Sequence, residues 1–320
     1  MISCQNIDWS DPQIEEMLPS PLYSQFNIDY QKYYMEDFQF EDRSLAIYDN
    51  NQLSAVLLLT RGVSSLGEVA YNWYGLPAVY LQHISINRDI DSILKKITNF
   101  IFQEKKFSLS FKIYHARRIP LIINDALDDN ATCENVFESI IDLTNSLTVI
   151  HKNIRKSYKN TINKSRRTLT HKIINSSTIT QSHIHDFRNF HILVSGRETR
   201  SQKTWEEQYN IIKKGNGFLV ISSITDVILG YSLYLNNKNI CYYGVGAYNR
   251  NYFNSTFVSH GAIWTAIEYA KYLSCKKFIL GKIFYPFQKL YISEKEYNIG
   301  IFKRGFSQSI EHSILVKLNK

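Results

Sequence analysis

Alternating apolar and polar positions predict strands in the first half of the chain. Asp49-Asn50-Asn51 separates two of these runs and has the composition of a hairpin turn. The apolar positions then take helical spacing before a last apolar run. The predicted elements are strands at 44–48, 53–60 and 69–80, a helix at 89–103 and a strand at 107–113.

The second half repeats this order of elements. Both predicted helices end in a lysine pair and a phenylalanine, Lys105-Lys106-Phe107 and Lys276-Lys277-Phe278. We interpret this as a duplication, with one domain at residues 1–150 and another at 151–320. The predicted elements here are strands at 218–224, 227–235 and 240–247, a helix at 257–273 and a strand at 277–280.

Antiparallel strands that lead into a helix and a further strand are typical of mixed α/β units. We therefore predict an α/β fold with mixed sheets in both domains. A chain of 320 residues with 44% hydrophobic residues has enough material for two cores.

The positive charge is concentrated in one segment. Residues 143–185 contain eight lysines and arginines and no acidic residue, so they account for the whole net charge of +8. Between Lys152 and Lys172 the apolar positions share one face of a predicted helix. This helix could contact tRNA phosphates, a pyrophosphate-linked acceptor or anionic lipid; alternatively, it is a solvated connecting helix.

Several classes of protein are not indicated by the sequence. No apolar run is long enough for a membrane helix, and the first residues lack the pattern of a signal peptide, so we expect a cytoplasmic protein. The cysteines are far apart, without zinc-site spacing, and we expect reduced thiols and no metal site. Walker, Rossmann and nucleophile-elbow motifs are lacking.

Three stretches of the second half, together with Ile154-Arg155-Lys156, carry a family resemblance. The chain resembles the FemABX-like families, including the short FemAB-related proteins of surface-polysaccharide gene sets. The inserted helical hairpin of the FemA branch is lacking. The three stretches are Ser195–Arg200 with Thr204–Gln208, Tyr242–Trp264 with Asn249-Arg250 and His260, and Glu294–Phe306.

The resemblance implies two tandem GNAT-like domains with an acyl acceptor in the cleft between them. The donor in FemABX enzymes proper is an aminoacyl-tRNA. The resemblance also implies that Lys303, in the Phe-Lys pair of the third stretch, stabilises the oxyanion of the transition state. The alternative is a solvated lysine beside a strand.

His260 and Trp264 lie four residues apart, on one face of the predicted second helix. A neutral imidazole near the helix N-terminus could accept a proton, because the helix dipole disfavours the imidazolium. A hydrogen-bonded packing histidine is the alternative, since no partner carboxylate is evident.

Arg197 and Arg200 lie between two predicted helices and could bind a phosphate or carboxylate. The alternative is a surface ion pair with a neighbouring glutamate. Thr204 and Glu207 have the spacing of a capping box for the second of these helices. Other predicted substrate-binding residues are Trp205, Tyr243 and Arg304, of which Tyr243 could belong to an aromatic wall with Tyr242 and Tyr248.

The predicted donor loop lacks the glycines that hold the pyrophosphate of coenzyme A in GNAT enzymes. Residues 249–256 read Asn-Arg-Asn-Tyr-Phe-Asn-Ser-Thr. We therefore expect weak binding of acetyl-CoA in the usual manner. The donor stays open between acyl-CoA and aminoacyl-tRNA, and no permanently bound cofactor is expected.

These observations predict an N-acyltransferase or aminoacyltransferase that modifies an amine of a cell-envelope precursor. The acceptor would be an amino sugar of a surface polysaccharide or a peptidoglycan-type peptide, nucleotide- or lipid-linked. The alternative is a non-catalytic nucleic-acid-binding protein that uses the basic helix.

Overall fold

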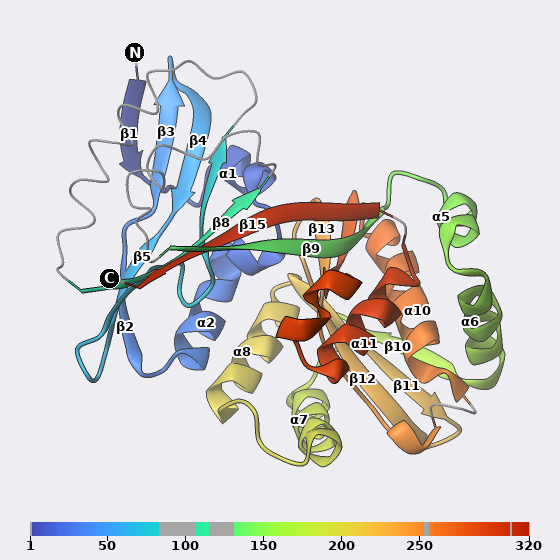
Figure 1. Ribbon diagram of the computed structural model, residues 1–320. Helices are drawn as coiled ribbons and strands as arrows, with labels where there is room; N and C mark the ends of the chain where they lie inside the picture. The colour runs from blue at the N-terminus through green and yellow to red at the C-terminus, as the bar shows by residue number, and fades with distance from the viewer. Residues whose placement is uncertain (1, 83–105, 115–130, 253–255, 308, 320) are drawn as a thin grey trace. The chain divides into compact units, whose positions relative to one another are not determined.

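The computed structural model describes residues 2–82, 106–114, 131–252, 256–307 and 309–319 (Figure 1). The chain forms two compact units, which do not follow a border at residue 150. Strands β9 (Thr132–Asp142) and β15 (Ser309–Asn319) each contribute residues to both units. Unit 1 comprises residues 1–19, 31–136 and 312–320, and unit 2 comprises residues 20–30 and 137–311.

Unit 1 is built on a mixed sheet with the order β1-β3-β4-β7-β8-β15, and β2, β5 and β6 extend it from β8. Its core includes Tyr71, Phe111 and Val316. Its elements are β1 (Ile2–Asn6), α1 (Pro12–Met17), β2 (Phe38–Asp42), β3 (Leu45–Asp49), β4 (Gln52–Leu58), β5 (Thr60–Ser64), β6 (Val69–Asn72), β7 (Ala78–Gln82) and β8 (Ser108–Tyr114), with α2 (Ile28–Tyr34) at its border.

The stretch predicted as one strand at residues 69–80 is two strands. A bridge between Trp73 and Leu76 closes a turn after β6, and Gly75 has a φ of 87° there. As a result, β8 pairs in parallel first with β6 and further along with β7. The helix predicted at residues 89–103 lies outside the described residues.

Unit 2 has the predicted order of three antiparallel strands, a helix and a strand. Its sheet runs β9-β14-β13-β12-β11-β10, and among these described strands only β13 and β14 pair in parallel. The strands are β10 (Thr170–Ile174), β11 (Gly217–Ile224), β12 (Val227–Asn236), β13 (Ile240–Tyr248) and β14 (Lys277–Ile283). The helices are η1 (Pro21–Tyr23), η2 (Gln25–Asn27), α5 (Leu147–Asn153), α6 (Lys156–Thr168), α7 (Gln181–Ser195), α8 (Gln202–Lys213), η3 (Arg250–Tyr252), α10 (Val258–Tyr272), η4 (Pro286–Tyr291) and α11 (Glu294–Arg304).

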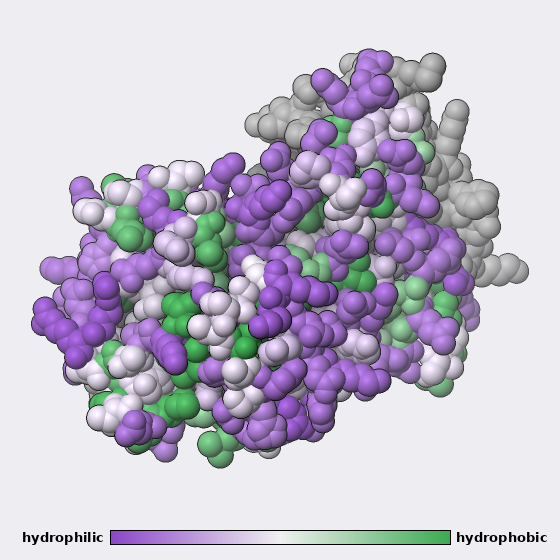
Figure 2. Space-filling model, turned by 180° about the vertical axis from the view of Figure 1, so that it is seen from behind, coloured by the Kyte–Doolittle hydropathy of each residue, from purple (hydrophilic) through white to green (hydrophobic). Residues whose placement is uncertain are grey.

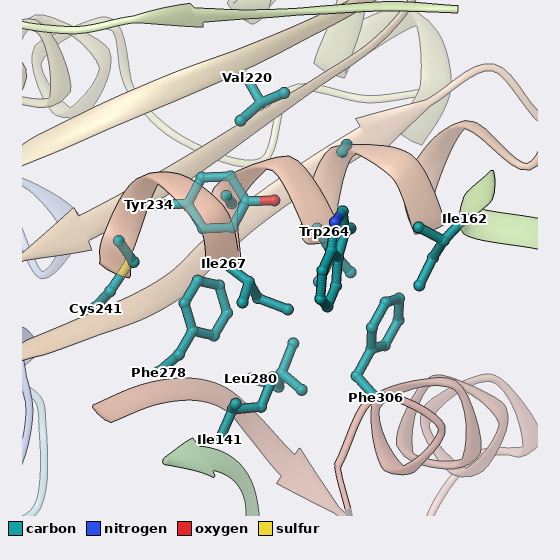
Figure 3. Packing of buried hydrophobic residues seen from close by; sticks show 14 of the residues in the cluster. Ile141, Ile162, Val220, Tyr234, Cys241, Trp264, Ile267, Phe278, Leu280 and Phe306 are labelled. Carbon is teal, nitrogen blue, oxygen red and sulfur yellow. The ribbon is translucent and has the colours of Figure 1, made fainter. Parts of the chain in front are cut away.

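Helices cover both faces of this sheet. Successive strand residues point to opposite sides, so neighbouring residues of one strand pack against different helices. In β11, Val220 belongs to the core cluster that includes α10, whereas Leu219 belongs to the cluster that includes α7 and α8. Figure 3 shows the first cluster, where Trp264 and Ile267 of α10 lie among the strand residues Tyr234 and Phe278. This packing fixes α10, and with it His260, against the sheet.

The basic segment is not the single helix predicted between Lys152 and Lys172. Ile154 and Arg155 are extended and separate α5 from α6, and the Arg155 N–H donates to the Gly305 carbonyl. Leu169 then ends α6, and β10 begins at the next residue. Ile154 and Leu169, at the two ends of α6, are both buried.

Hydrophilic residues cover most of the surface seen in Figure 2, with apolar residues in small groups between them. None of the helices in the described part of the chain is both long and apolar enough to cross a membrane.

Candidate functional site

Lys303 lies in the last turn of α11 and does not flank a strand. Ser293 caps this helix by accepting a hydrogen bond from the Glu296 N–H, and the Glu296 side chain accepts one from the Ser293 N–H in return. The helix packs against β14. Lys303 is therefore held by a capped helix against a core strand, and its side chain reaches that strand.

The amine of Lys303 ends beside Gly281 of β14. A β-carbon built on Gly281 would lie 3.0 Å from Lys303 Nζ and 3.5 Å from Tyr242 Oη. Gly281 has a φ of 91°, next to a bulge between Ile279 and Gly281 in the pairing with β9. The absent side chain keeps free a small space that the amine and the hydroxyl share.

The two parallel strands of unit 2 separate at this point. Registered pairs between β13 and β14 end at Tyr242 and Ile279, although β13 continues to Tyr248 and β14 to Ile283. Tyr242 is thus the last residue of β13 that pairs with β14, whereas the pairing of β13 with β12 continues to Tyr248. The separation leaves backbone groups of both strands near Lys303 without a partner in the ladder, and such groups can bind an extended substrate.

Burial lowers the pKa of Lys303 to about 8, the Glu138 carboxylate acts in the opposite direction, and Lys282 adds a smaller lowering. Glu138 is itself buried and faces Lys282 across the pairing of β9 with β14. Burial, followed by the charge of Glu138, raises the pKa of Tyr242. At neutral pH the site therefore presents an ammonium and a phenol, which both donate hydrogen bonds.

His260 lies in the first turn of α10 among aromatic rings. Its ring centroid is 4.4 Å from that of Tyr158, 5.1 Å from that of Phe302 and 5.7 Å from that of Phe306. Neither ring nitrogen has a hydrogen-bond partner among the described residues, and burial lowers the pKa of His260 to about 4. These contacts favour packing over proton acceptance, but the ring packs without the hydrogen bond that the packing alternative included.

Arg197 and Arg200 lie in the loop between α7 and α8. Glu198 pairs with Arg188 at 2.6 Å, so it is not the partner of either arginine. Arg200 lies over the ring of Trp205, 5.6 Å from its centroid, and Trp205 is buried in the core against Phe187. A buried Trp205 can orient Arg200, but its own ring is committed to packing.

The capping box predicted from Thr204 and Glu207 is wrong. Ser201 is the N-cap of α8, and Thr204 is buried inside the helix, where its hydroxyl donates to the Ser201 carbonyl. Glu207 accepts from the Asn210 side chain. The helix begins one turn earlier than the sequence pattern indicated.

The other two predicted binding residues have aromatic neighbours. Tyr243 stacks on Tyr234 with their centroids 5.4 Å apart, and burial raises its pKa well above the usual value. Arg304 lies over the ring of Tyr285, 5.0 Å from its centroid. Arg304 follows Lys303 directly, whereas Tyr243 follows Tyr242 and points to the opposite face of β13.

Two amides of the loop before α10 are bonded within the loop, and the Asn249 N–H donates to the Leu229 carbonyl of β12. Asn249 Oδ1 accepts from the Asn251 N–H, and the Asn249 carbonyl accepts from the Tyr252 N–H. Residues 253–255 lie outside the described part. No group of three or more histidine, cysteine or acidic residues that could hold a metal ion occurs among the residues described.

Neither a protein-family model nor a curated protein matches the chain. Solved structures do resemble it. FemX has a TM-score of 0.73 at 11% identity, with 98% of this chain and 96% of that chain covered. L-PGS from Bacillus licheniformis has a TM-score of 0.58 at 10% identity, with 97% and 92% covered. The C-terminal domain of a putative lysylphosphatidylglycerol synthetase from Agrobacterium fabrum has a TM-score of 0.56 at 11% identity, with 90% of this chain and 86% of that chain covered.

The chain is thus a mixed α/β protein of two compact units. More particularly, it has the fold of FemX. The predicted mixed α/β fold class is confirmed, and so is the FemABX-like resemblance at the level of the fold. Sequence reasoning missed Glu138 and Gly281, because a buried acid and a positive-φ glycine inside strands have no motif of their own.

Proposed function

We propose that this chain is an N-acyltransferase or aminoacyltransferase that acts on an amine of a cell-envelope precursor, with Lys303 as the oxyanion-stabilising residue. The observation that carries the proposal is the buried Lys303 ammonium beside the Tyr242 hydroxyl, where β13 and β14 separate. A buried cation with a second donor suits an oxygen that becomes negative during acyl transfer.

In the proposed reaction, the acceptor nitrogen attacks the donor carbonyl and forms the new C–N bond. The carbonyl electron pair moves to oxygen, where Lys303 Nζ and Tyr242 Oη donate hydrogen bonds. The intermediate collapses to an amide as the leaving oxygen or sulfur takes the bonding pair. The proton that the acceptor nitrogen loses ends on that leaving oxygen or sulfur, which departs as an alcohol or a thiol. The Glu138 carboxylate raises the pKa of Lys303 and so favours its charged form.

The loop before α10 supports an aminoacyl ester as donor over acyl-CoA. It has no glycines, and the Asn251 N–H is already bonded to Asn249, so a phosphate finds fewer free amides there. We expect acetyl-CoA to bind only weakly. Calorimetry with acetyl-CoA, and with free coenzyme A as competitor, tests this; micromolar binding would contradict it.

An envelope acceptor is supported by the comparisons at the level of analogy. One similar structure is a domain of a putative lysylphosphatidylglycerol synthetase, whose name denotes an aminoacylated membrane lipid. Arg197 and Arg200 remain the proposed contacts for a phosphate of the acceptor or the donor. Arg304 and Tyr243 are further proposed binding residues.

The proposal is tested by comparing native envelope glycans and peptides by mass spectrometry, with and without this protein. A missing acyl or amino-acid mass identifies the transferred group. Restoration by the wild-type chain but not by Lys303→Met would support Lys303 as the catalytic residue. Full restoration by Lys303→Met would refute the proposed site.

A second candidate function is nucleic-acid binding without catalysis. Lys152, Arg155, Lys156, Lys164 and Arg167 are all exposed on α5, α6 or between them. Arg166 pairs with Glu268 at 3.2 Å. Salt-dependent RNA binding without transfer to any amine would favour this candidate over the acyltransferase.

A further inference from the structure

The segment between β14 and α11 exposes large apolar side chains in a short stretch. Phe287, Leu290 and Tyr291 of η4 are 63%, 88% and 85% exposed. We call these three residues the η4 patch. A 3₁₀-helix has three residues per turn, so Phe287 and Leu290 lie on the same side of η4. Three such side chains within five residues form a local apolar surface rather than scattered exposure.

Neighbouring contacts hold this segment in place. The ring of Phe287 stacks parallel to that of Tyr285, with centroids 5.9 Å apart, and Phe137 meets both rings edge-on. Lys289 lies over the ring of Tyr297 in α11, 5.4 Å from its centroid. The exposed side chains of the η4 patch therefore stand next to a packed group of aromatic rings, Tyr285 and Phe137.

The charges around the patch are mostly positive. Residues 282–304 contain five lysines and arginines against two glutamates. Lys282, Lys289 and Lys295 are exposed, whereas Glu296 accepts hydrogen bonds from Ser293. Aromatic and leucine tips among cations match the acyl boundary and the anionic headgroups of a lipid bilayer.

We propose that the η4 patch inserts into the surface of an anionic membrane, with Lys289 and Lys295 contacting lipid headgroups. Insertion removes the three apolar side chains from water, and the lysines favour phosphatidylglycerol over neutral lipid. Because η4 leads directly into α11, a docked patch would bring Lys303 close to lipid-linked amines. That last consequence rests on the proposed acyltransferase function; the docking itself does not.

The test is co-sedimentation of the full chain with phosphatidylcholine vesicles, with and without phosphatidylglycerol, in the absence of donor and acceptor. We expect the wild type to sediment with phosphatidylglycerol vesicles. Replacing Phe287, Leu290 and Tyr291 together by serine should weaken binding by about tenfold or more. Lys289→Gln and Lys295→Gln should each weaken it about fivefold, and only with phosphatidylglycerol present.

A matched control is the double variant Leu193→Ser with Tyr272→Ser, since these side chains are 77% and 79% exposed on α7 and α10. Equal loss of binding in this control would overturn the proposal. The proposal would also be overturned if the wild-type chain stayed in the supernatant. It would be overturned as well if sedimentation velocity showed self-association that the triple serine variant abolishes, because a second copy of the chain would then cover the patch.

A second readout does not depend on the serine variant folding. Tyr291→Trp places a fluorophore at the patch, and its emission should shift to the blue when phosphatidylglycerol vesicles are added. An unchanged spectrum would count against insertion. Loss of acyl transfer with vesicle binding intact would instead refute the proposed function and leave the docking proposal standing.

Discussion

Two nitrogen bases in unit 2, Lys303 and His260, are both partly buried and both have a lowered pKa, yet their surroundings differ. Lys303 has a carboxylate, a phenol and the backbone of Gly281 near its amine. His260 has four aromatic rings around it and no hydrogen-bond partner among the described residues. Burial alone therefore does not mark a reactive group.

The two residues differ in how well their surroundings stabilise the protonated, positively charged side chain. At Lys303, Glu138 offsets part of the cost of burying the ammonium, so the charge is available at neutral pH. At His260, only desolvation acts on the pKa, and a proton would be placed among apolar rings. We infer that the first environment suits catalysis and the second suits packing.

The largest expected effect separates these roles in turnover. Lys303→Met should lower kcat by about 100- to 1,000-fold, because the charge acts mainly when the carbonyl oxygen becomes negative. His260→Phe should keep turnover within a fewfold of the wild type. Steady-state kinetics on both folded variants gives the answer, and reversed effects would exchange the two assignments.

The next effect is on stability. The folded pKa of His260 is about 4, below its ordinary value of 6.5, so the unfolded chain binds a proton that the folded chain does not between those pH values. Stability from this source is present above pH 6.5 and falls as the pH drops toward 4, by up to about 3 kcal/mol.

His260→Phe should remove this part of the loss of stability in acid. The free energy of unfolding, measured with urea at neutral pH and at about pH 5, tests this. His171, whose pKa burial also lowers to about 4, provides the comparison, because its ring bonds to Ser165 and Ser222. An unchanged pH dependence in His260→Phe would show that the ring is solvated in solution.

A smaller effect sharpens the assignment of Lys303. If turnover needs the ammonium, kcat should fall as pH rises through about 8. Glu138→Gln removes the charge that raises the pKa of Lys303, so the fall of kcat at high pH (the high-pH limb of the profile) should move to lower pH. Lys282→Gln removes a lowering influence and should move the limb to higher pH by a smaller amount. Shifts in the same direction would contradict the arrangement.

The smallest expected effect concerns Arg200. Arg200→Ala should raise KM severalfold with little change in kcat, since a lost phosphate contact weakens binding without touching the reacting carbonyl. Arg200→Lys is the control, because it keeps the charge over Trp205 but loses the planar fork. A fall in kcat alone would place Arg200 at the chemistry instead.

Local patterns predicted the elements of unit 2 well. The predicted strands of the second half correspond to β11 to β14, and the helix predicted at 257–273 corresponds to α10. The Phe-Lys motif pointed to Lys303. Its position in a helix that Ser293 caps was not predicted.

Contacts between distant parts of the sequence could not be predicted in this way. Glu138 and Tyr242 are close to Lys303 only because β9, β14 and β13 are neighbours in the sheet. The start of α8 depended on the burial of Thr204, which a capping pattern does not report. Periodicity shows which face of an element is apolar, but not which element covers it.

The strand β15 has a consequence for the order of folding. Its residues Ser313–Asn319 pair with β8, and Val316 and Leu318 belong to the core of unit 1. The first strands of unit 1 therefore leave the ribosome long before their last partner, while residues 137–311 of unit 2 are already synthesised. Until β15 is synthesised and pairs with β8, β8 exposes an unpaired edge, and such an edge can pair with other chains and cause aggregation.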